Sequence, residues 1–90
     1  MIHVQYSGKA QKALQKLDTE TAERILLKVK YFSSSRENIF RYGKKLKIFK
    51  EATHRFRVGD YRVLFRIDQK TKQVVILVIV NVVHRKEAYL

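Results

Sequence analysis

Basic side chains are concentrated in two short segments of the sequence, and their types suit chemistry on a phosphodiester. The first segment, HRFRVGDYRVLFRID (residues 54–68), holds four arginines, and the second, HRKEAY (84–89), brings together an imidazole, a guanidinium, an ammonium and a phenol. Cleavage of RNA by its own 2′-oxygen needs a group that takes the hydroxyl proton, cations that hold the charge of the pentavalent phosphate, and a donor to the leaving 5′-oxygen. The two segments together offer all three kinds of group.

The first segment has the pattern of a β-hairpin whose two-residue turn is Gly59-Asp60. Because successive side chains of a strand point to opposite faces, this turn divides the hairpin into an apolar and a basic face. The core face would hold Phe56, Val58, Tyr61, Val63 and Phe65. The other face would hold Arg55, Arg57, Arg62 and Arg66, with Leu64 among them. It would hold no carboxylate.

Arg57 would lie opposite Arg62 in this hairpin, and like charges directly opposite on a sheet are unfavourable. A solvated face normally mixes charges of both signs, so four arginines without a carboxylate need another explanation. Arginine forms forked contacts with phosphate and stacks on bases. We therefore interpret the basic face as a phosphate-binding surface.

The second segment follows the last strand, and we expect it to lie beside the basic face. His84, Arg85 and Lys86 would then stand next to the arginines, followed by Tyr89. His84 or Tyr89 would handle protons. Alternatively, Tyr89 would stack on a splayed base.

The composition predicts one small domain, residues 1–90, with a polyanionic partner. Its 20 lysines and arginines against 8 acidic residues give a net charge of +12, a field that attracts nucleic acid first, an acidic protein second and an anionic membrane third. There is no cysteine, and neither a carboxylate pair nor a His/Cys spacing suggests a metal site or a cofactor. The amino terminus lacks the apolar run of a signal peptide, and the apolar run 74–80 is too short to span a bilayer, so we expect a cytoplasmic protein.

The pattern of elements is β-α-α-β-β-β-β, which predicts an α+β fold. Residues 2–6 alternate as a strand, Ser7 can cap a first helix, and Asp18 or Thr19 can start a second. Residues 36–43 suggest a short turn of helix and a loop, and strands are expected at 44–50, 53–58, 61–67 and 74–80. The last of these is apolar on both faces, as a central strand is. We expect an antiparallel sheet with the two amino-terminal helices on one face.

The motifs R.R.GDYR (55–62) and HRK..Y (84–89), set in this order of elements, resemble the RelE/ParE superfamily of toxins from toxin–antitoxin operons. The resemblance implies that the antiparallel sheet is curved. The RelE branch implies a metal-independent endoribonuclease that enters the ribosomal A site and cuts mRNA, without a cofactor. The ParE branch implies inhibition of DNA gyrase instead. Both branches imply a small acidic antitoxin, encoded beside the toxin, as partner.

By position, the resemblance implies catalytic roles for Arg55, Arg62, Arg85 and Tyr89, with His84 as an alternative proton carrier. Arg62 and Arg85 would stabilise the phosphate in the transition state. A strand lysine of some members aligns with Thr53, so its role would pass to Lys47, Arg57 or His54. The remaining basic residues would bind RNA: Arg57, Lys47, His54, Arg66 and Lys86. We favour the nuclease over a gyrase inhibitor, and a diverged member that only binds antitoxin is the third alternative.

Overall fold

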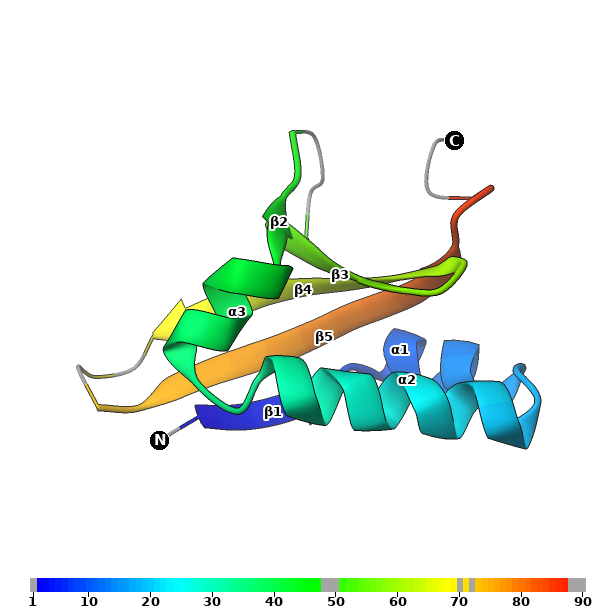
Figure 1. Cartoon of the computed structure of the whole chain (residues 1–90), viewed down its shortest axis with the longest axis horizontal. Coiled ribbons are helices and arrows are strands. Elements are labelled where there is room, and N and C mark those ends of the chain that lie inside the picture. Colours follow the sequence, from blue (N-terminus) through cyan, green and yellow to red (C-terminus); the bar gives the residue numbers. More distant parts are fainter. Residues whose placement is uncertain (1, 48–50, 70, 72, 88–90) are drawn as a thin grey trace.

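The computed structural model describes residues 2–47, 51–69, 71 and 73–87, which form three helices and one five-stranded sheet (Figure 1). The α+β class is the predicted one. In chain order the elements are β1 (Ile2–Tyr6), α1 (Gly8–Gln15), α2 (Thr19–Phe32), α3 (Arg36–Tyr42), β2 (Lys44–Lys45), β3 (His54–Val58), β4 (Tyr61–Gln69) and β5 (Val75–His84). Within the described residues, no helix is both long and apolar enough to cross a bilayer.

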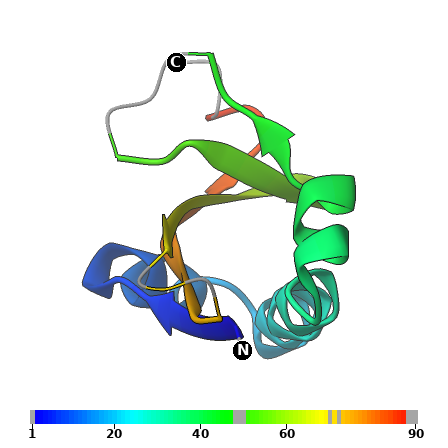
Figure 2. The ribbon, with the colours of Figure 1, turned by 90° about the vertical axis from the view of Figure 1, so that its left-hand side faces the viewer.

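The strands are ordered β1-β5-β4-β3-β2, and the sheet is antiparallel except that β1 runs parallel to β5. The prediction was a wholly antiparallel sheet, whereas the parallel pairing of β1 with β5 makes the sheet mixed. β1 and β5 are joined through nearly the whole chain, not by a tight turn, so their relative direction is not set by a hairpin. Figure 2 shows the sheet as a curved layer with α2 and α3 on one side.

Each helix begins at a polar residue that caps it. The side chains of Ser7, Asp18 and Ser35 accept hydrogen bonds from the backbone N–H groups of Ala10, Thr21 and Asn38. The first two caps confirm the predicted helix starts. The expected turn of helix near residue 36 is the third helix, α3, which ends before Gly43.

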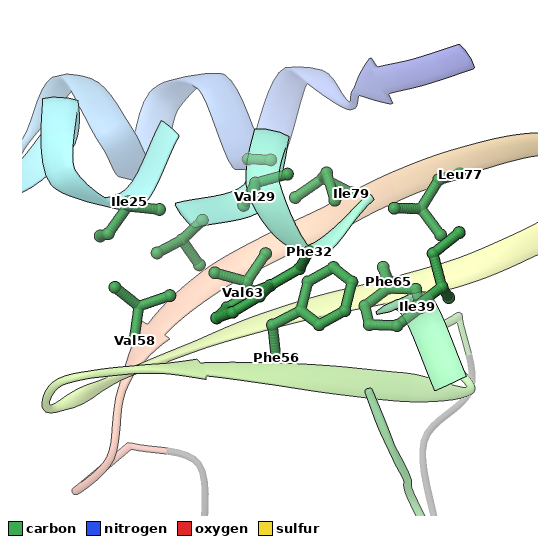
Figure 3. Close-up of a cluster of buried hydrophobic side chains, with 12 residues drawn as sticks. Ile25, Val29, Phe32, Ile39, Phe56, Val58, Val63, Phe65, Leu77 and Ile79 are labelled. Atoms are coloured by element: carbon green, nitrogen blue, oxygen red, sulfur yellow. The ribbon is translucent and has the colours of Figure 1, made fainter. Parts of the chain in front are cut away.

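The main core lies between the sheet and the helices. Ile25, Val29 and Phe32 of α2 point toward the buried side chains of β3, β4 and β5 (Figure 3). At its centre, the rings of Phe56 and Phe65 stack with their centroids 4.2 Å apart, and Phe32 packs on Phe56 at 5.1 Å. Small and branched side chains of α1, including the fully buried Ala10, complete this layer.

The β3–β4 hairpin has the predicted register. Val58 pairs with Tyr61, Arg57 with Arg62, and Phe56 with Val63. Gly59 has a φ of +57°, whereas no other described residue has a positive φ, which is the pattern of a turn with glycine at its first central position. The hairpin's core face therefore contacts the helices, and the arginines lie on the opposite face.

β2 and β5 differ most in length from the prediction, and β4 extends two residues beyond its predicted end, to Gln69. β2 comprises only Lys44–Lys45, against the expected 44–50, and residues 48–50 lie outside the described part of the chain. β5 continues to His84, four residues beyond the predicted end. Its pairing with β4 contains a bulge, because Leu64 is opposite Asn81 while Phe65 is opposite Ile79. Val80 is the extra residue.

Candidate nucleic-acid interface

The arginine face, which consists of Arg55, Arg57, Arg62 and Arg66, lies on the side of β3 and β4 away from the helices. Its four members differ widely in exposure. Arg57 is exposed, Arg55 is half-buried, and the side chain of Arg66 is 42% exposed, whereas only 4% of Arg62 is exposed. The sequence predicted an open polar face, whereas in the structure Arg62 and Leu64 at the middle of this face are buried.

A second apolar cluster lies at this buried middle. Ala52, Leu64 and Val80 are buried together, with Leu46 and Val83 packed against them. The cluster is held at its base by two backbone bonds, from Leu46 N to Thr53 O and from Thr53 N to Phe65 O, both of 2.9 Å. Leu46 and Ala52, which lie between β2 and β3, thus pack with Leu64 and leave the arginines arranged around an apolar patch.

Arg57 and Arg62 are direct partners across the two strands, as predicted. Val83 lies opposite Arg62 on its other side, so the buried guanidinium has a cation on one neighbouring strand and an apolar side chain on the next. Arginine stays cationic in proteins, and a cation near a low-dielectric surface acts more strongly on an incoming anion than one in water does. This pair is the part of the face best suited to a phosphate.

Arg66 corrects the expectation that the face has no carboxylate. Its Nε lies 3.4 Å from Oδ2 of Asp68, two residues along the same strand. The prediction ended the strand at residue 67, although β4 continues to Gln69 and alternation places Asp68 beside Arg66. Arg66 is therefore partly neutralised, and the positive charge of the face is concentrated on the hairpin side.

Arg85 lies at the rim of the face, beside the hairpin turn. Its backbone N–H donates to the carbonyl oxygen of Asp60 at 2.7 Å, and its Nε is 3.7 Å from Oδ1 of the same residue. Both side chains are more than half exposed, so the ion pair itself is weak. Asp60, which sequence reasoning treated only as a turn residue, ties the segment after β5 to the turn next to Arg62.

His84 is not beside the arginines, and this prediction was wrong. It pairs with Tyr61 on the helix-facing side, and the two rings meet edge-to-face with centroids 5.3 Å apart. The bulge at Val80 is the cause, because one extra residue moves every following side chain to the opposite face of the sheet. The apolar run around the bulge has no alternation that could have revealed it.

His54 also lies on the helix-facing side, away from the arginine face, because it pairs with Phe65. Its contact with RNA stays a prediction. Its ring stacks on Phe65 at 5.5 Å and meets Phe40 edge-on at 6.3 Å. Its Nδ1 is 2.8 Å from the hydroxyl oxygen of Thr53. Burial, followed by the nearby ammonium of Lys45, lowers the pKa of His54.

The other predicted residues are placed as follows. Lys47 is exposed at a bend after β2, next to Leu46 of the second apolar cluster. Lys86 is exposed in the turn after β5. Tyr89 lies outside the described residues. In the described part of the chain, no three His, Cys, Asp or Glu side chains gather as a metal site requires.

Comparison with known proteins identifies the family. Residues 4–89 match the family model described as the ParE toxin of type II toxin–antitoxin systems, parDE. The chain belongs to the ParE toxin family. It is thus a toxin of a type II toxin–antitoxin system, within the RelE/ParE superfamily that its motifs resemble. A search among curated proteins gives no match.

Solved structures similar to the toxin are toxin–antitoxin complexes. It is 33% identical to a chain of the RelBE2 complex from Mycobacterium tuberculosis, with 92% of this chain and 96% of that chain covered and a TM-score of 0.63. The RelB–RelE complex from Methanococcus jannaschii contains a chain 24% identical, covering 94% of each chain, with a TM-score of 0.67. The archaeal RelE–RelB complex from Pyrococcus horikoshii OT3 contains a chain that is 23% identical, with 93% of this chain and 94% of that chain covered and a TM-score of 0.65. The two archaeal chains share the fold of this toxin.

Proposed function

We propose that this toxin is a metal-independent endoribonuclease that cleaves mRNA in the ribosomal A site. The observation that supports it most is the pair Arg57–Arg62, directly opposite on adjacent strands, with Arg85 at the rim. The partly covered arginine face offers cations at the edge of an apolar patch, where they stabilise the developing charge of a pentavalent phosphate. Its similarity to the RelBE2 chain also favours the RelE branch.

The four groups have separate roles in this proposal. Arg62 and Arg85 stabilise the charge of the reacting phosphate, while Arg55 and Arg57 hold the flanking backbone. Since His84 lies on the other side of the sheet, proton transfer passes to Tyr89. Burial gives Arg62 a fixed position, and electrostatic stabilisation depends on such fixed positions.

The partner that neutralises the toxin is a small acidic antitoxin. The net charge of +12 favours an acidic partner. The three similar structures were solved as toxin–antitoxin complexes.

A gyrase-directed toxin is the second candidate, and the name of the matching family favours it. In that case the arginine face would contact DNA or protein without cleavage. Induction of the toxin, followed by mapping of mRNA 5′ ends and by measurement of plasmid supercoiling in the same cells, separates the two. Codon-phased cuts with unchanged supercoiling support the nuclease. DNA breaks without phased cuts refute it.

Three variants test the site itself. We expect Arg57→Gln, Arg62→Gln and Arg85→Gln to lose growth arrest and phased cuts, because each removes a cation that holds the phosphate. Lys28→Gln, which removes one exposed charge on α2, is the matched control and should remain toxic. Thermal unfolding checks that each variant is folded, which matters most for the buried Arg62. Full toxicity of all three arginine variants would refute the assignment.

A further inference from the structure

A second basic groove lies on the helix-facing side of the sheet, between α1 and the ends of β4 and β5. Its volume is about 480 Å³. Two lysines of α1 and Lys16, which caps its carboxyl end, line one side, and Tyr61, His84 and Glu87 line the facing wall. The arginine face shares none of these residues, so this α1 groove is a separate surface.

The three lysines converge because of their helical spacing. Lys9, Lys12 and Lys16 follow one another at intervals of three and four, which places them on one side of a helix. All three are exposed, and they span about 10 Å along the axis at 1.5 Å per residue. Among the described residues that line the groove, Glu87 is the one carboxylate. A solvated helix face normally mixes charges, and this one does not.

The facing wall combines aromatic rings with this charge. Tyr61 and His84 are half-buried, and their rings meet edge-to-face. The bulge at Val80 is what turns His84 toward α1 and away from the arginines. Cations that follow a backbone, next to rings on which a base can stack, are the combination by which proteins bind single-stranded nucleic acid.

We propose that the α1 groove binds the sugar–phosphate backbone of a single-stranded nucleic acid. An acidic protein segment would be attracted by the same lysines, but it would gain less from the two rings. The groove opens at the end of the sheet that carries the hairpin turn, since Tyr61 directly follows the turn and His84 directly precedes Arg85. A nucleic-acid strand bound on the arginine face could therefore continue around the hairpin end of the sheet into the groove. The proposal goes beyond the proposed function, because it requires binding and no cleavage.

The test uses two double variants of the purified full-length chain. K12Q/K16Q removes two lysines of the groove, and K28Q/K30Q removes two exposed lysines of α2 that do not line it. Both change the net charge by the same amount, and each removes the basic residue of its helix's last turn. The probes are fluorescent 12-nucleotide strands of 2′-O-methyl RNA and of DNA, which lack the hydroxyl that cleavage needs. Anisotropy is measured from 50 to 300 mM salt.

We expect K12Q/K16Q to bind at least one of the two strands about tenfold more weakly near 150 mM salt, with a salt slope lower by about 1.4. These values follow from about 0.7 counterions released per single-strand phosphate contact. K28Q/K30Q should change both quantities much less. The NMR signals of the Tyr61 and His84 rings should shift when the strand is added to the wild-type protein and remain still in K12Q/K16Q.

Equal effects of the two double variants would overturn the proposal, and so would ring signals that do not respond in the wild-type protein. If K12Q/K16Q still binds both nucleic-acid strands but no longer binds a peptide of twelve glutamates, the proposal is overturned in favour of an acidic protein segment. Comparison of the RNA and DNA strands shows which nucleic acid the groove prefers. Because no ribosome and no cleavable bond is present, the result is independent of whether the toxin cuts mRNA.

Discussion

Gly43 joins α3 to β2, and an added methyl group there would meet two atoms that have little room to move. A Cβ would lie 2.5 Å from the carbonyl oxygen of Ile39 and 2.8 Å from a ring carbon of Phe65. The carbonyl is backbone and already accepts the N–H of Gly43 at 2.7 Å. The ring is fully buried and stacked on Phe56. Gly43→Ala must therefore shift either the end of α3 or the centre of the core.

Overpacking of this kind costs about 1–3 kcal/mol, and two close contacts place Gly43→Ala near the upper end, at about 3 kcal/mol. A chain of this size is stable by about 5–10 kcal/mol, so the loss is a large share of the total. The expected fall in Tm is about 12–24 °C, at about 4–8 °C per kcal/mol. Urea denaturation followed by circular dichroism would measure the free energy of unfolding.

Gly8→Ala is the matched control, because no atom lies within 4 Å of a Cβ at this position. It should be neutral or stabilise the protein by about 0.4–1 kcal/mol, since alanine restricts the unfolded chain more than glycine does. A cost below about 1 kcal/mol for Gly43→Ala would refute the reasoning, and so would similar losses for both variants. Either result would mean that the close approach at Gly43 relaxes freely.

Two further predictions concern Ser7 and His54. Ser7→Ala should lower the free energy of unfolding by about 2 kcal/mol, measured in urea, because it removes the cap bond from Ala10 N and the 2.7 Å bond to the Val80 carbonyl at the bulge; an unchanged value would contradict this. Since burial and then Lys45 lower the pKa of His54, the folded protein resists its protonation. The stability from neutral His54 is present above about pH 6.5, the unfolded value, and is lost as the pH falls below it. His54→Phe should weaken this loss between pH 7.5 and 5, and an identical pH profile would refute the assignment.

The arginine face shows where period-two alternation is sufficient. Arginines and apolar residues alternate in 55–58 and 61–66 with Leu64 as the one exception, and a glycine marks the turn. A one-residue slip of the register would therefore bury arginines in the core. The pairing of Arg57 with Arg62 could therefore be predicted, and it is confirmed. The caps Ser7 and Asp18 could be predicted for a similar reason, since they bond within three residues of themselves.

His84 and Arg62 show where such local rules fail. The run before His84 is apolar on both faces, so no alternation marks the extra residue Val80, and only the pairing of β5 with β4 decides where the bulge falls. The bulge sends His84 to the α1 groove. Arg62 is buried on the face where Leu64, Ala52 and Val83 gather, and these three residues come from separate parts of the chain.

The sequence by itself determined the family, the elements and the two faces of the hairpin. These depend on motifs, caps and periodicities that extend over a few residues, and each is consistent with the rest. Only the tertiary structure decided which arginines are exposed, which carboxylates lie near them, and on which side of the sheet His84 stands. Those features depend on strand pairing and packing between residues far apart in the chain, and a single bulge is enough to reverse a face.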